Sequence, residues 1–175
     1  SPGGERTIFS FRGANVALAP APSTLLDGAR WLHISAYALF EGSQRRSTLE
    51  LLDAALARKL PISLDLCLPV LRAWHHEIEA LLPRLAILFA NEHELVALCP
   101  APTQDEAAAQ LLGTGLPLAV IKLGPRGCLL ASSGLSQQHP TFPVPALDTN
   151  GCGDAFVAGF LAAHLRGAEL AHSVG

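Results

Sequence analysis

The stretch DTNGCGD at residues 148–154 runs directly into the apolar stretch AFVAGFL at residues 155–161. Two glycines and a carboxylate therefore stand where the apolar pattern predicts the start of a helix. Small residues let a backbone approach an anion closely, and the N–H groups of a first helical turn point toward that anion. Gly153 is expected to need a φ above zero, and Asp154 adds a proton acceptor. The alternative is a plain turn followed by an acid that favours the helix dipole.

Asn91 and Glu94 stand where the apolar run at residues 85–89 gives way to a helical pattern. One interpretation is that both are site residues at this strand end. The alternative is a solvated helix start in which Asn91 is the N-cap and acids occupy the first turn.

Residues 120–131 contain a β-branched run, a turn with glycine and proline, and a second apolar run, which together predict a hairpin. Lys122 is the last residue of the first of these strands. It is either a site residue or a solvent-facing strand end. Residues 5–12 alternate like a half-buried strand that leads into a Gly-Ala-Asn turn. Arg12 is either a substrate contact or an ordinary exposed arginine.

Apolar β-like segments alternate with helical ones along the rest of the chain. We predict strands at residues 32–36, 62–66, 86–89 and 118–122, and helices at residues 47–58, 70–82, 92–98 and from a capping box at 103–106 to near residue 113. This order predicts an α/β fold with a parallel sheet and helices on both faces. Ligands of such sheets bind beyond the carboxyl ends of the strands, where Asp65, Asn91 and Gly124 fall.

Composition favours a single domain with a sizeable core, since the chain has 175 residues of which half are hydrophobic and only 15% are charged. The net charge of −3 argues against a nucleic-acid partner, and no apolar run approaches the length that crosses a membrane. The polar start predicts no signal peptide. The cysteines are widely spaced, which disfavours zinc or disulfides and predicts a cytoplasmic protein. The seven histidines show no metal-ligand spacing with cysteines or acids.

These segments, in this order, resemble the motifs of the ribokinase-like (PfkB) carbohydrate kinases over essentially the whole chain. The resemblance implies a ribokinase-like three-layer α/β/α sandwich with a mostly parallel sheet. It implies ATP-dependent phosphorylation of a sugar or sugar-like hydroxyl, with ATP, Mg²⁺ and a monovalent cation such as K⁺ as cofactors. A homodimer of the full-length protein is also expected.

The resemblance also assigns roles to single residues. Asp154 would be the general base, and the amides of Gly151, Cys152 and Gly153 would stabilise the transferring phosphoryl group. The remaining matches are the nucleotide site at Lys122, Gly124 and Gly127, the substrate contacts Arg12 and Asp148, water-mediated Mg²⁺ at Asn91 and Glu94, and a monovalent cation at Asp148 and Thr149.

The chain departs from the family in two places. Residues 66–69 (LCLP) replace the alternating Asn and Arg of sugar-acid and fructose kinases, which puts those substrates in doubt. The family's N-terminal sugar and lid segment and its C-terminal adenine-binding segment also have no counterpart. We therefore expect residues 1–175 to be one partial kinase core, truncated at both ends and inactive alone.

Two other functions are alternatives to a kinase. A non-catalytic sugar- or nucleotide-binding regulatory protein on the same fold has no need of a base at the anion site, so Asp154 argues against it. A dinucleotide-binding domain requires a following strand and an acid about 20 residues beyond the glycines, which this sequence lacks.

Overall fold

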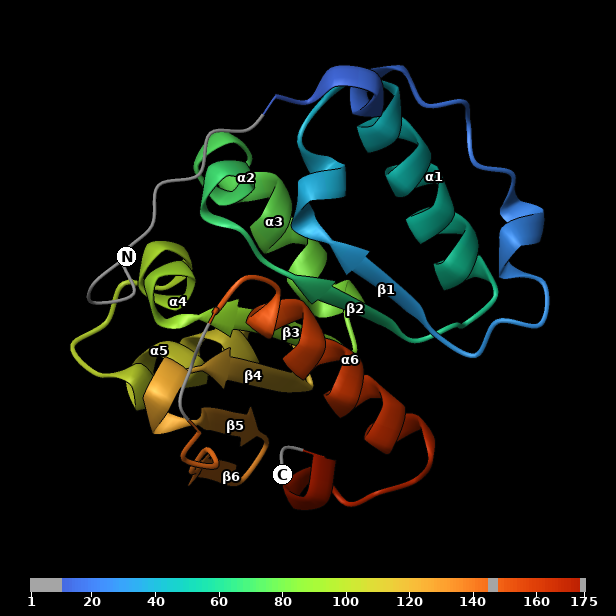
Figure 1. The fold of residues 1–175 in the computed structure, drawn as a ribbon. Coiled ribbons are helices and arrows are strands. Elements are labelled where there is room, and N and C mark those ends of the chain that lie inside the picture. Colours follow the sequence, from blue (N-terminus) through green and yellow to red (C-terminus); the bar gives the residue numbers. More distant parts are fainter. Residues whose placement is uncertain (1–10, 145–147, 174–175) are drawn as a thin grey trace.

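Six strands form one sheet, and their spatial order is their order along the chain. The computed structural model describes residues 11–144 and 148–173 (Figure 1). The strands are β1 (Leu32–Ser35), β2 (Ile62–Asp65), β3 (Ile87–Asn91), β4 (Leu118–Lys122), β5 (Cys128–Ser132) and β6 (Leu135–His139). Strands β1 to β4 pair in parallel, whereas β5 and β6 extend the sheet antiparallel. The predicted mostly parallel sheet is thus confirmed.

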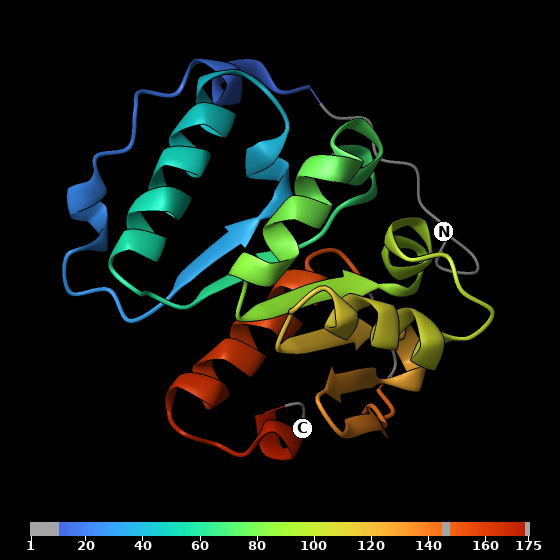
Figure 2. The same cartoon turned by 180° about the vertical axis from the view of Figure 1, so that it is seen from behind.

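Helices cover both faces of this sheet. The α-helices are α1 (Gly42–Ala57), α2 (Leu68–Ala73), α3 (His75–Leu81), α4 (Glu92–Leu98), α5 (Gln104–Gly113) and α6 (Cys152–Leu165). Short 3₁₀-helices lie at η1 (Gly13–Ala17), η2 (Ser23–Leu26), η3 (Ala36–Leu39), η4 (Leu82–Arg84), η5 (Gly124–Arg126) and η6 (Leu170–Ser173). Helix α6 lies on one face, and α1 to α5 lie on the other (Figures 1 and 2).

Successive side chains of the central strands point to opposite faces of the sheet, so the core has two layers. Ile87 and Phe89 of β3 pack toward α6, while Leu88 and Ala90 pack toward the helices of the opposite face. Strand β4 follows the same rule, because Val120 joins the α6 layer. Strands buried on both faces explain why these segments read as continuous apolar runs. Together with the helices they form the expected α/β/α sandwich.

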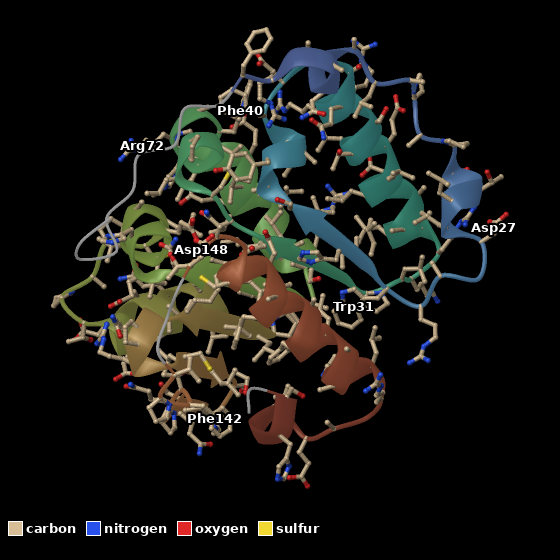
Figure 3. All side chains as sticks on the ribbon, in the orientation of Figure 1. Asp27, Trp31, Phe40, Arg72, Phe142 and Asp148 are labelled. Atoms are coloured by element: carbon tan, nitrogen blue, oxygen red, sulfur yellow. The ribbon has the colours of Figure 1, made fainter. Side chains whose placement is uncertain are left out.

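Phe160 anchors α6 on the sheet. Its side chain is 1% exposed, and its ring meets the ring of Phe89 edge to face at a centroid distance of 5.3 Å. The ring of His164 stacks with that of Phe160 and meets the ring of Trp31 edge to face. Trp31, labelled in Figure 3, directly precedes β1. Aromatic contacts of this kind fix the position of the helix along the strands beneath it.

The prediction of one helix over residues 70–82 was wrong. The structure has two helices there, α2 and α3, because Trp74 leaves helical geometry at φ −137° and ψ 43°. Its indole Nε1 donates to the carbonyl of Phe40 at 2.9 Å, and the guanidinium of Arg45 lies 3.6 Å from the ring centroid. These tertiary contacts outweigh the local helical pattern.

The other predicted elements are present with shifted ends. Helix α1 begins at Gly42 instead of residue 47, and β3 extends to Asn91. Thr103 caps α5 as expected, by accepting from the N–H of Glu106 at 3.2 Å. Most of the opening strand predicted at residues 5–12 lies outside the described residues, and the turn after it forms η1. No helix among the described residues has the length and apolar character needed to span a bilayer.

Candidate active site

The carboxyl ends of three parallel strands bring polar side chains to one edge of the sheet. Asp65 ends β2, Asn91 ends β3 and Lys122 ends β4. Asn91 and Lys122 are direct partners in the β3–β4 register. This is the edge at which parallel α/β sheets bind ligands.

Lys122 and Asp65 form an ion pair across the intervening strand β3. Nζ of Lys122 lies 2.6 Å from Oδ1 of Asp65, and the two side chains are 18% and 12% exposed. In register, Asp65 pairs with Phe89, and Phe89 pairs with Val120 of the α6 layer. Asp65 therefore faces α6, and so does Lys122, two residues beyond Val120 on the same strand. Burial raises the pKa of Asp65 above its usual value, although the Lys122 charge acts against this.

The loop before α6 is shaped by Asp148. Its Oδ1 accepts from the N–H of Asn150 at 2.9 Å, and its Oδ2 accepts from the Asn150 side-chain amide at 3.2 Å. Gly151 then adopts the left-handed conformation, with φ 72°, as the N-cap of α6. Figure 3 shows Asp148 near the end of the sheet where α6 begins. Asp148 thus has a structural task, and its substrate and cation roles stay predictions.

Gly153 lies inside the first turn of α6, next to Lys122. A Cβ on Gly153 would stand 3.5 Å from Nζ of Lys122, so the ammonium is adjacent to this turn. The expectation that Gly153 has a φ above zero was wrong, because that conformation belongs to Gly151. Helix geometry leaves the first N–H groups of α6 without intrahelical acceptors, although Cys152 N–H reaches the Thr149 carbonyl at 3.3 Å.

Asp154 is exposed on the same turn as Gly153. Its charge acts on the pKa of both Asp65 and His33. The general-base candidate, the helix amides and Lys122 therefore share one corner of the molecule.

Asn91 and Glu94 form a complete capping box at the start of α4. The Asn91 side chain accepts from the N–H of Glu94 at 2.9 Å, and Oε2 of Glu94 accepts from the N–H of Asn91 at 2.7 Å. The N-cap interpretation of Asn91 is therefore confirmed. Glu94 is only 6% exposed, and its burial raises its pKa, while hydrogen bonds from Asn91 and the Lys122 charge act against this.

The charges at this edge fit a bound cation. Among the described residues, the charges of Lys122 and Asp154 act on the pKa of Asp65, and the charges of Lys122 and Asp65 act on the pKa of Glu94. The carboxylates of Asp65 and Glu94 are both buried, so the single ammonium of Lys122 balances their negative charge only in part, and the remainder is costly to bury. Mg²⁺ held through water at Asn91 and Glu94 would offset it, and this assignment stays a prediction.

His33 and Ser63 were not identified from sequence as part of this corner. Ser63 is fully buried, its hydroxyl accepts from Trp31 Nε1 at 2.8 Å, and it lies 2.9 Å from His33 Nδ1. Burial lowers the pKa of His33, whereas the charge of Asp65 acts against this. The available signal was the alternation of β1 and β2, which puts polar side chains on the α6 face at His33, Ser63 and Asp65.

The hairpin between β4 and β5 lies beside the same edge. Gly124 and Gly127 both have positive φ, 58° and 89°. Arg126, between them, forms an ion pair with Glu92 of α4 and so ties the hairpin to that helix. The nucleotide-binding roles of the two glycines stay predictions.

Arg12 is held by the protein itself. Its Nη2 donates to the Tyr37 carbonyl at 2.7 Å and to Oε1 of Gln44 at 2.8 Å, and the guanidinium lies 5.6 Å from the Phe40 ring centroid. Arg12 also lines a shallow depression of about 430 Å³ with Phe11, Gly13, Val16, Glu41 and Gly42. Its role as a substrate contact stays a prediction.

The four cysteines are free, and burial raises the pKa of Cys67 and Cys128 to about 11, as for inert core thiols.

The expectation that no histidine has ligand-like spacing to an acid was wrong. His75, His76 and Glu79 of α3 hold one ligand atom each within 4.8 Å of one another at the surface.

Comparison with known proteins places the whole chain in one family. The model of the pfkB family of carbohydrate kinases matches residues 1–175. Adenosine kinase of Schizophyllum commune is 32% identical over 88% of this chain, and fructokinase of Klebsiella pneumoniae is 32% identical over 91%. These alignments cover 50% and 54% of those proteins, so the chain spans about half their length.

A solved structure shares the fold. An E. coli protein described as a ribokinase II, in complex with ATP and Mg²⁺, superposes with a TM-score of 0.78 at 21% identity over 87% of this chain and 51% of that one. The chain belongs to the pfkB family of carbohydrate kinases and has the ribokinase-like fold.

Gly127 allows a direct test of the hairpin. A Cβ there would stand 1.9 Å from the carbonyl oxygen of His139 at the end of β6. An alanine at this position would have a strained backbone conformation, and the chain at His139 would have to move away from its Cβ. Gly127→Ala should therefore lower the free energy of unfolding by about 3–5 kcal/mol. Gly134→Ala is the matched control, because its φ is 77° but nothing lies within 4 Å. It should cost about 1–2 kcal/mol in urea denaturation, and equal losses would contradict the clash.

Proposed function

We propose that this protein transfers the γ-phosphoryl group of ATP to a hydroxyl of a sugar or nucleoside. The observation that carries the proposal is the first turn of α6, where the exposed Asp154 follows Gly153, itself adjacent to the Lys122 ammonium. A base and anion-binding amides on this turn, with a cation of β4 beside it, match what phosphoryl transfer requires. Family membership and relatives named adenosine kinase and fructokinase support the same reaction.

Asp154 acts as the general base. Its carboxylate accepts the proton of the acceptor hydroxyl as the oxygen attacks the γ-phosphorus, the bond from this phosphorus to the bridging oxygen of ATP breaks, and the products are a phosphate monoester and ADP. The amides at the start of α6 face the charge that develops on the phosphoryl oxygens. Their orientation is set by the helix before the reaction, so they need no reorganisation.

Asn91 and Glu94 are the residues that would hold Mg²⁺ through water molecules. When bound, Mg²⁺ supplies positive charge that offsets the charge of the phosphates. The capping box fixes both side chains and so fixes where those waters are held. We further propose that Asp148 and Thr149 contribute to a K⁺ site in the loop before α6, and that the protein works in the reducing cytoplasm, where its four cysteines stay free.

The acceptor is proposed at the level of a class. Relatives act on nucleosides and on fructose according to their names. Residues 66–69, which continue from Asp65 into α2, lack the polar pattern described above for sugar-acid and fructose kinases. A nucleoside or ribose is therefore the first acceptor to test, followed by fructose and 2-keto-3-deoxygluconate.

Asp154→Asn in the intact protein should lower kcat about 10²–10⁴-fold with little change in ATP affinity, because a general base is lost while the amides remain. Acceptor-dependent ADP release measures kcat, and calorimetric titration measures ATP binding. Asp105→Asn is the matched control, since Asp105 also occupies the first turn of a helix, α5, far from Asp154 in sequence. Near-normal turnover of Asp154→Asn would rule out the base assignment. An intact wild-type protein that binds an acceptor but releases no ADP would favour a regulatory binding protein.

Glu94→Gln should raise the Mg²⁺ concentration that gives half-maximal activity about 10–100-fold, the usual effect of losing an outer-sphere partner of a metal. A chelator should abolish ADP release in both forms. Glu92→Gln is the control, because Glu92 lies in the same first turn of α4 but pairs with Arg126. An unchanged Mg²⁺ dependence in Glu94→Gln would contradict the assignment.

A further inference from the structure

Lys122 lies at the end of α6 that disfavours cations. The N-terminus of a helix carries partial positive charge, so it attracts anions, whereas cations are favoured at the C-terminus. The Lys122 ammonium nevertheless lies at the N-terminal turn of α6, 3.5 Å from where a Gly153 Cβ would stand. Two sources of positive charge thus face the same small volume. Such an arrangement is stabilised when an anion lies between them.

Asp65 is what holds the ammonium there. The Nζ–Oδ1 distance of 2.6 Å is short for a charged pair, and both side chains are largely shielded from water. Lys122 reaches Asp65 over β3, so its long side chain is fixed at both ends, by the strand and by the carboxylate. A lysine held at both ends loses less conformational freedom when it binds a ligand.

Stability alone is a weak reason for such a pair. Burying two charges carries a desolvation cost that their attraction often fails to exceed, and apolar replacements are frequently as stable. The neighbouring residues Phe89 and Val120 show that this face of the sheet accommodates apolar side chains. The charges are therefore better explained by what they do at the edge of the sheet than by what they add to the core.

Resting on the proposed function, we propose that Asp65 is a positioning residue that acts through Lys122. Its carboxylate places the ammonium against Gly153, where it binds the transferring phosphoryl group together with the α6 amides. No bond to Asp65 forms or breaks. Asp65 also partly neutralises Lys122, so that phosphate binds without being held too tightly for release.

The test is a double-mutant cycle that needs no turnover. Binding of inorganic triphosphate to the intact protein is measured by calorimetry for the wild type, Lys122→Met, Asp65→Asn and the double variant. Lys122→Met should weaken binding about 10–100-fold, because a charge-assisted contact is lost and Asp65 is left to repel the anion. The double variant should recover about 3–10-fold of that loss, and Asp65→Asn alone should change affinity by less than about 3-fold, since neutralisation and positioning oppose each other.

Matched variants separate this role from a structural one. Asp27→Asn removes the acid of an exposed ion pair with Arg58, 2.8 Å apart, and should leave triphosphate binding unchanged. Figure 3 shows Asp27 far from Asp148 and the start of α6. Lys122→Gln should show the loss seen with Lys122→Met, and it replaces that variant if methionine impairs folding. Lys122→Arg should bind more tightly than Lys122→Met, because the positive charge is kept although the guanidinium is larger than the ammonium.

Turnover adds a second readout. With an accepted substrate, Asp65→Asn should lower kcat about 10–100-fold while KM for ATP stays the same or falls, because placement matters most in the transition state. Wild-type binding by Lys122→Met, or a double variant no better than Lys122→Met, would overturn the proposal. An unchanged kcat in Asp65→Asn would do so too. A wild-type protein that shows no turnover would contradict only the proposed kinase activity. The triphosphate-binding cycle would still decide whether Asp65 acts through Lys122.

Discussion

The packing of α6 on β3 and β4 is the constraint on which the rest of the site depends. Phe160 meets Phe89 edge to face and is almost fully buried, so α6 has one position along the strands beneath it. That position brings its first turn to the carboxyl ends of β2, β3 and β4. Gly153 then lies against Lys122, and Asp154 lies within electrostatic reach of Asp65. Core packing thus determines the geometry of the chemistry.

The electrostatics of this corner support the proposal that it binds a nucleotide with its metal ion. The helix terminus and Lys122 attract phosphate, whereas the carboxylates of Asp65, Glu94 and Asp154 oppose it. Burial raises the pKa of both Asp65 and Glu94, and the charge of Lys122 acts against this rise. A ligand that carries phosphates and Mg²⁺ together satisfies both halves of the corner, and this is the form in which kinases take ATP.

Sequence reasoning predicted the sheet, most of its helices and the glycine turn before α6, because hydrophobic alternation and the positions of glycines are local signals. It joined α2 and α3, since the contacts of Trp74 with Phe40 and Arg45 come from elsewhere in the chain. It gave the positive φ to Gly153 instead of Gly151, because motif spacing does not specify where the helix begins. Asp65 was placed at the strand ends without a partner, since a contact across β3 to Lys122 has no sequence signature.

The most direct test of the account is a crystal structure of the intact protein with Mg²⁺ and a non-hydrolysable ATP analogue. The account predicts that the γ-phosphate oxygens lie within hydrogen-bonding distance of the amide of Gly153 and of Lys122 Nζ, with Asp154 facing the acceptor site. A γ-phosphate bound elsewhere, with the first turn of α6 contacted only by solvent, would contradict it.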